Sequence, residues 1–76
     1  MKTTKKQKKN FWVRRSPLDT TSDFQWWFTY ATFFTKGEAI TFLELLAENF
    51  SDHNIEMHED YFIDHTTQTK TEILVI

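Results

Sequence analysis

The residues of this chain that are best suited to chemistry lie between Asp52 and His65. This stretch holds three histidines and five acids, which are His53, His58, His65, Asp52, Glu56, Glu59, Asp60 and Asp64. Imidazole and carboxylate groups bind zinc and act as general acids or bases. No cysteine pair completes a structural zinc site, however, and histidines scattered among acids are typical of a solvated surface. We therefore expect no metal, and we expect the acids to raise the pKa values of the histidines.

Catalysis is not favoured by the arrangement of the remaining reactive residues. Ser51, Asp52 and His53 are the residue types of a hydrolase triad, but a triad needs side chains that converge from separate elements. The single glycine, Gly37, excludes a glycine-rich phosphate loop. A chain of 76 residues also leaves little room for a concave substrate pocket. The sequence predicts a non-enzymatic protein without a cofactor.

Charge is divided by position along the chain. Residues 1–15 carry seven Lys or Arg and no acid, whereas residues 16–76 carry all eleven acids and two lysines. The net charge of −2 thus conceals a basic start and an acidic body. Because residues 1–9 hold no large apolar side chain except the first methionine, we predict a flexible basic arm, followed by a single domain over residues 10–76. The absence of cysteine and of a long apolar run predicts a cytoplasmic protein that has no membrane partner.

Four segments have the composition of β-strands. They cover residues 10–15, 24–33, 55–63 and 70–76. Strict alternation over 24–33 places four rings on one face of the predicted strand, and they are Phe24, Trp26, Phe28 and Tyr30. The rings of Trp27 and Phe33 are predicted to lie on the opposite face. Alternation over 55–63 predicts that one strand face carries Ile55, Met57, Tyr61 and Ile63.

A helix is predicted between the second and third strands. Thr35 and Glu38 have the spacing of a capping box, which marks a helix N-terminus. The apolar residues that follow share one helical face, and they are Ala39, Leu43, Leu46 and Phe50. The predicted fold is therefore α+β: one small ββαββ domain, with a mostly antiparallel sheet and one amphipathic helix packed on one face. A single helix leaves the second sheet face for a partner.

Eight Phe, three Trp and two Tyr are a heavy aromatic load for so small a chain, and some of these rings should remain on the surface. In size, lack of cysteine and aromatic content the chain resembles, as a type, small phage-encoded inhibitors of host machinery. The first hypothesis is a protein-binding module that docks on and modulates or inhibits a larger protein, such as one with a basic nucleic-acid groove. Its candidate residues are Trp26, Trp27, Phe28, Tyr30, Glu44, Glu48, Glu56, Glu59, Asp60 and Asp64.

Two alternatives remain open. One is a small RNA- or single-stranded-DNA-binding protein, in which cations hold phosphates and an aromatic ring stacks on a base. The residues for that role are Lys5, Lys6, Lys8, Lys9, Trp12, Arg14 and Arg15. The other alternative is a structural subunit whose exposed sheet face pairs into a homodimer.

Overall fold

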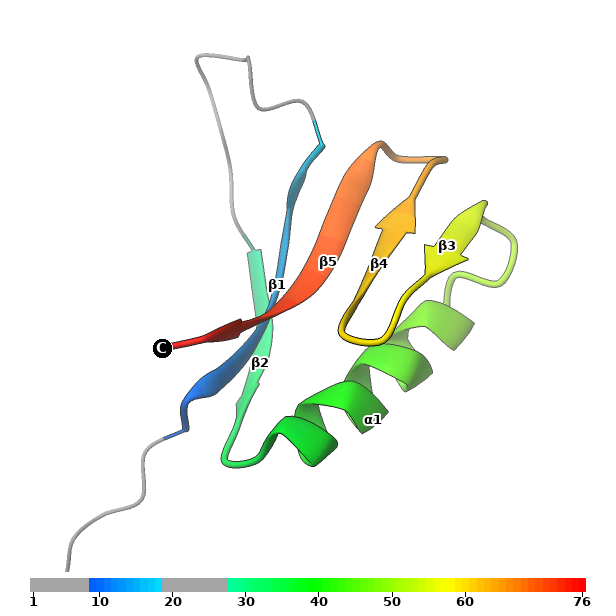
Figure 1. Cartoon of the computed structure of the whole chain (residues 1–76). Coiled ribbons are helices and arrows are strands. Elements are labelled where there is room, and N and C mark those ends of the chain that lie inside the picture. The colour runs from blue at the N-terminus through cyan, green and yellow to red at the C-terminus, as the bar shows by residue number, and fades with distance from the viewer. Residues whose placement is uncertain (1–8, 19–27) are drawn as a thin grey trace, which may run out of the picture.

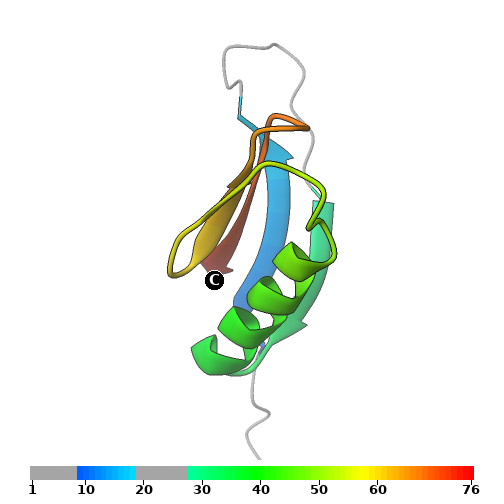
Figure 2. The same ribbon diagram turned by 90° about the vertical axis from the view of Figure 1, so that its right-hand side faces the viewer.

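The computed structural model describes residues 9–18 and 28–76. Within them the elements follow one another as β1 (Phe11–Pro17), β2 (Phe28–Phe33), α1 (Lys36–Glu48), β3 (Ile55–Met57), β4 (Tyr61–Asp64) and β5 (Thr69–Val75) (Figure 1). The strands form one antiparallel sheet in the order β2-β1-β5-β4-β3, and α1 packs across one face (Figure 2). The predicted α+β fold is confirmed. The predicted arm, apart from Lys9, lies outside the described residues, as do Trp26 and Trp27.

The predicted strand over 55–63 is two short strands. Met57 at the end of β3 pairs with Phe62 in β4, and the His58 backbone N–H donates to the Tyr61 carbonyl at 2.9 Å. The two acidic residues between them form the turn, a position that suits aspartate. The turn reverses the chain, so Phe62 points to the same side of the sheet as Met57 and is 1% exposed. The prediction that Met57 and Tyr61 share a face is therefore wrong.

Strand β2 departs from strict alternation because it contains a β-bulge. The register against β1 shifts between Val13 and Arg14, where Val13 pairs with Ala31 and Arg14 pairs with Thr29. The extra residue, Tyr30, changes the side to which the remaining side chains point. The rings of residues 28, 30 and 33 accordingly all lie on the side of the sheet that α1 covers, which we call the helix side. The predicted separation of Phe33 from the other two rings is wrong.

The helix begins where its sequence predicts. Thr35 Oγ1 accepts a hydrogen bond from the Glu38 backbone N–H at 3.2 Å, and Glu38 Oε1 accepts one from the Thr35 backbone N–H at 3.1 Å. This reciprocal pair is the capping box, and it satisfies two backbone donors that the first helical turn leaves free. Apolar spacing then buries Ala39, Leu43 and Leu46 against the sheet.

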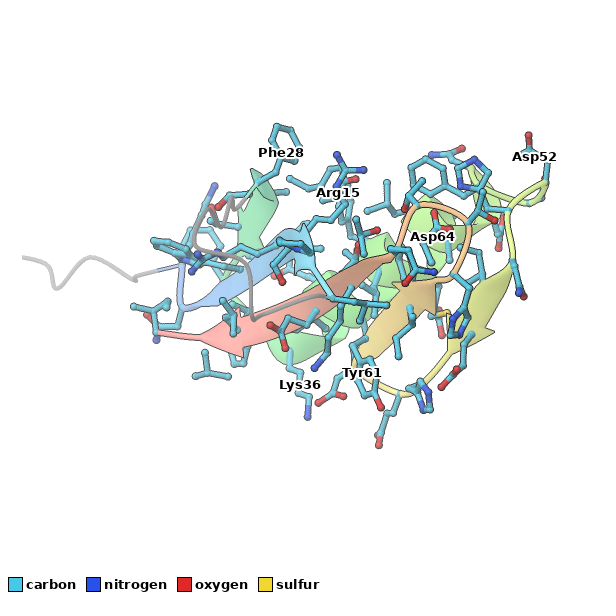
Figure 3. All side chains as sticks on the ribbon, turned by 90° about the horizontal axis from the view of Figure 1, so that it is seen from above. Arg15, Phe28, Lys36, Asp52, Tyr61 and Asp64 are labelled. Carbon is cyan, nitrogen blue, oxygen red and sulfur yellow. The ribbon has the colours of Figure 1, made fainter. Side chains whose placement is uncertain are left out.

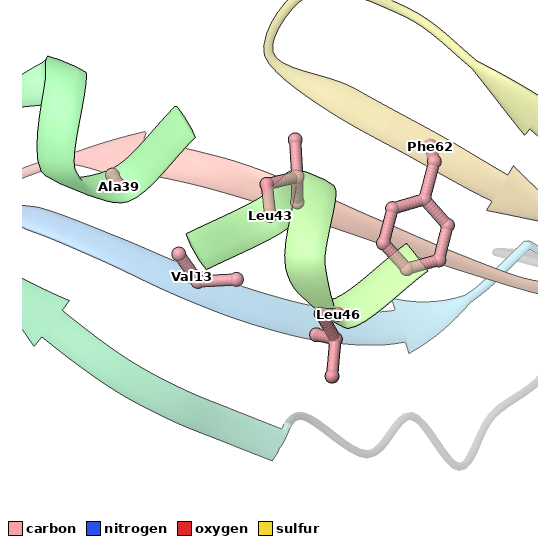
Figure 4. Close-up of a cluster of buried hydrophobic side chains, with 5 residues drawn as sticks. All are labelled: Val13, Ala39, Leu43, Leu46 and Phe62. Atoms are coloured by element: carbon pink, nitrogen blue, oxygen red, sulfur yellow. The ribbon is translucent and has the colours of Figure 1, made fainter. Parts of the chain in front are cut away.

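The buried core is small and lies between α1 and the sheet. It consists of Val13, Ala39, Leu43, Leu46 and Phe62 (Figure 4). Half-buried side chains surround it, namely Phe11, Tyr30, Phe33, Phe42, Ala47, Phe50, Ile55 and Ile73. Val13 from the middle of β1 and Leu43 from the middle of α1 are both fully buried. The helix is thus fixed against the centre of the sheet, and its two long flanks face the outer strands.

The other side of the sheet, which we call the open side, has no helix over it among the described residues. Side chains that alternate with the buried ones point there, including Trp12, Arg14, Tyr61, Ile63, Lys70, Glu72 and Leu74. None of the described helical residues forms a segment long and apolar enough to cross a membrane.

Candidate protein-binding surfaces

An open groove lies between α1 and the edge strand β3. It measures about 400 Å³ and is lined by Glu44, Ala47, Glu48, Ile55 and Met57. We call it the α1–β3 groove. Its floor is apolar and two carboxylates stand at its rim, while Met57 is 44% exposed. Sequence alternation did not single out Met57, because only the hairpin turn places it on the helix side beside the acids.

The charge around the α1–β3 groove has one sign. Between Lys36 and Lys70 the sequence holds eight acids and no lysine or arginine. Both Glu44 and Glu48 are exposed, and the last turn of α1 carries no basic residue. The groove therefore presents negative charge beside apolar surface, which suits a partner that is both basic and apolar.

A second groove lies on the opposite flank of α1, beside β2. It measures about 620 Å³, and we call it the α1–β2 groove. Its lining is mostly apolar, with Phe33, Gly37, Glu38, Thr41, Phe42 and Leu45. The rings of Phe33 and Phe42 lie 5.3 Å apart, and Leu45 is 56% exposed. Leu45 is not among the residues of the predicted apolar helix face, and the structure shows that it lines this groove.

The start of β2 carries an aromatic pair next to a guanidinium group. Phe28 is 49% exposed and meets Tyr30 edge to face at 4.8 Å between ring centres. The Arg15 guanidinium lies 5.9 Å from the Phe28 ring centre and 5.6 Å from that of Tyr30 (Figure 3). Tyr30 also packs toward Phe42 of α1, at 6.5 Å. Phe28 is therefore the more accessible of the two rings.

The predicted acids do not form one surface. Glu44 and Glu48 line the α1–β3 groove, while Glu59 and Asp60 lie in the turn between β3 and β4. Asp64 is 4% exposed, so its carboxylate contributes little to the outer surface. Of the predicted acids, only the two on α1 line the α1–β3 groove.

Glu56 is held between two histidines on the open side of the sheet. Its carboxylate oxygens lie 2.5 Å from His58 Nε2 and 2.8 Å from His65 Nε2. The hydrogen bonds from His58 and then His65 hold the pKa of Glu56 below its usual value. The His58 ring also stacks on Tyr61, at 4.3 Å between centres. These contacts join β3, the hairpin turn and the β4–β5 loop.

Asp64 and His53 form a second imidazole–carboxylate pair, 2.7 Å apart from Asp64 Oδ2 to His53 Nδ1. Burial raises the pKa of Asp64, but the bonds from His53 and from the backbone N–H groups of Thr67 and Thr66 outweigh it, so the pKa is lowered. The hydrogen bond to Asp64 raises the pKa of His53. For His53 the predicted upward shift is confirmed. Asp64 thus fixes the β4–β5 loop and the end of the helical segment together.

The residues proposed for nucleic acid are also divided. Lys5, Lys6 and Lys8 lie outside the described residues, and Lys9 Nζ lies 5.2 Å from the centre of the Phe34 ring. Trp12 and Arg14 point to the open side, whereas Arg15 points to the helix side. The Trp12 indole N–H donates to the Lys9 carbonyl at 3.0 Å. Among the described members of the predicted set, Trp12 and Arg14 therefore share a face of the sheet that Arg15 does not.

No group of acids and imidazoles within residues 9–18 and 28–76 has an arrangement that could hold a metal ion. Comparison with protein-family models, with curated proteins and with solved structures found no match for this chain.

Proposed function

We propose that this chain is a small non-enzymatic module that binds a larger protein through the α1–β3 groove. The observation that supports the proposal most strongly is the combination of apolar floor and acidic rim. Met57 and Ile55 offer apolar contact, while Glu44 and Glu48 stand on the facing helix. A lysine or arginine side chain fits such a groove, because its aliphatic stem packs on apolar atoms while its charge meets a carboxylate.

The partner is a protein surface that is rich in Lys or Arg, such as the basic groove of a protein that handles nucleic acid. The eight acids between Lys36 and Lys70 would attract such a surface from a distance and speed association at low salt. Binding here would modulate or block the partner by covering its basic surface. Phe28 lies on β2, at the other end of the sheet order, so it is not part of this contact.

The test uses a defined probe: a fluorescently labelled peptide of alternating lysine and leucine, titrated with the full chain and followed by anisotropy. A peptide with glutamate in place of lysine serves as the negative probe. We expect Glu44→Lys/Glu48→Lys to weaken binding of the basic peptide by at least about tenfold, because like charges then face each other. Circular dichroism checks that the variant remains folded.

A matched control separates the groove from overall charge. Asp52→Lys/Glu59→Lys changes the net charge by the same amount at two exposed residues that do not line the groove. We expect this control to lose much less affinity than the groove variant. Equal losses in the two variants would show that the peptide responds to net charge alone, and the proposal would then fail.

A second candidate function is binding of single-stranded nucleic acid on the open side of the sheet. Trp12, Arg14, Tyr61 and Lys70 all point there, with Lys70 Nζ 4.7 Å from the centre of the Tyr61 ring. Aromatic rings beside cations are the parts of a base-stacking platform. Salt-sensitive anisotropy of a labelled oligonucleotide, lost in Trp12→Ala and after deletion of residues 2–9, would support this function; no binding at low salt would end it.

A further inference from the structure

Strand β2 has an outer edge that pairs with no other strand in the described part of the chain. Its six residues, FTYATF, include neither a charged residue nor a proline. Charges, prolines and β-bulges are among the features that keep an edge strand from pairing with a second chain, and of these β2 has only its bulge. The other edge strand, β3, has only three residues. Thus β2 is the edge that offers backbone groups over a useful length.

The sequence of β2 is self-complementary in antiparallel pairing. A two-fold axis between Tyr30 and Ala31 sets Phe28 opposite Phe33 of a second copy, and Thr29 opposite Thr32 of that copy. Because of the bulge, residues 28 and 33 both point to the helix side. Thr29 pairs with Arg14 and Thr32 pairs with Trp12, so both threonines point to the open side. Each opposed pair therefore lies on one face of the joined sheet, as antiparallel pairing requires.

We propose that two copies of this chain form a homodimer through β2, which joins their sheets into one. The apolar surface next to the edge supports a second copy as the occupant. In this register Phe28, which is 49% exposed, lies beside Phe33 of the second copy. That residue lines the α1–β2 groove together with Phe42 and Leu45. Two-fold symmetry repeats the contact, so each copy covers the groove of the other.

The charges at the two ends of β2 are complementary as well. Arg15 of β1 pairs with Phe28, the first residue of β2, and therefore lies beside one end of β2. Glu38 lines the α1–β2 groove beside Phe33, at the other end. Antiparallel pairing brings Arg15 of one copy toward Glu38 of the second copy, at two symmetric points. The uncharged residues between them bring no like charges together.

The test measures the mass of the full chain by sedimentation over about a hundredfold range of concentration, since dimer formation depends on concentration. We expect the mass to rise from 9.2 kDa toward twice that value. Thr29→Lys/Thr32→Lys places lysines opposite each other across the axis, and we expect it to raise the dissociation constant at least about tenfold. Asn49→Lys/Ser51→Lys adds the same charge at exposed residues away from β2 and should leave the dimer intact.

A constant mass of 9.2 kDa at every concentration would overturn the proposal. A dimer that the β2 variant leaves unchanged would overturn it too, because another surface would then be responsible. Should the lysine variant fail to fold, disulfide formation gives an independent answer, since the chain has no cysteine of its own.

For that experiment Thr29→Cys and Thr32→Cys are mixed, with one of them isotopically labelled. Directly opposed residues have Cα atoms about 4.5–5.5 Å apart, which a disulfide can bridge. We expect oxidation to link the two different variants in preference to identical ones. Absence of that mixed product would exclude the proposed register.

Discussion

Leu43 and Leu45 are the same side chain two residues apart on α1, and the structure gives them opposite surroundings. Leu43 is fully buried in the core, whereas Leu45 is 56% exposed. Truncation of Leu43 to alanine removes about three methylene equivalents from the core, which corresponds to about 2.4 kcal/mol of lost burial. The residual cavity adds to this loss, so we expect Leu43→Ala to cost about 3–5 kcal/mol.

That cost is large for this domain. A chain of 76 residues has a free energy of unfolding of about 4–11 kcal/mol, so Leu43→Ala would remove a substantial part of it. The core has only five buried apolar side chains among the described residues, and few neighbours can move into the cavity. Leu45→Ala, by contrast, should change the free energy of unfolding by no more than about 0.5 kcal/mol in dilute solution.

The assay is urea unfolding of both variants and the wild type, followed by circular dichroism. If the free energy of unfolding depends on urea concentration with the same slope in all three proteins, their stabilities can be compared directly. Similar losses for the two variants, or a negligible loss for Leu43→Ala, would refute the helix register on which the core depends.

Two further predictions concern the cap of α1 and the pair that fixes the β4–β5 loop. Thr35→Ala removes the capping hydrogen bond and should cost about 1 kcal/mol in the same urea assay, with Thr35→Ser retaining most of the stability. The pKa of His53 is raised in the folded chain, so its stabilising contribution is complete below the unfolded pKa of about 6.5 and is lost as pH rises through the folded pKa. The pKa of Asp64 is lowered, so its contribution is present above the unfolded pKa and is lost as pH falls through the folded one. We therefore expect the midpoint of thermal unfolding to fall as the pH rises above about 6.5, and to fall less in His53→Gln. Identical slopes in the two proteins would contradict this role.

The helix could be predicted from the sequence because its signals are local. Thr35 and Glu38 are three residues apart, and the buried positions repeat with the helical period. The strands were harder to place, because alternation within one segment does not show where a tight turn reverses it. Residues 55–63 read as one strand, although two acids in the middle form a turn. The bulge at Tyr30 depends on pairing with β1, which is remote in sequence.

The candidate surfaces depend on those same non-local features. Composition identified an acidic and aromatic body, and the predicted protein-binding set included Glu44 and Glu48, which are exposed in the structure. It did not pair them with Met57, because the side to which Met57 points is set by its register with Phe62. Nor did it show that Asp64 is buried, because its partner His53 lies eleven positions earlier, next to the end of the helix.

The two flanks of α1 differ in a way that separates the two proposals. The groove toward β3 has two acids at its rim, whereas the groove toward β2 is lined mostly by apolar side chains and lies beside an uncharged strand edge. The two grooves share no lining residue. Reversal of Glu44 and Glu48 should therefore weaken peptide binding while the dimer persists, and lysines at Thr29 and Thr32 should dissociate the dimer while peptide binding persists. If either pair of substitutions abolished both properties in a folded protein, the two surfaces would be coupled, and assignment of one role to each flank of α1 would be wrong.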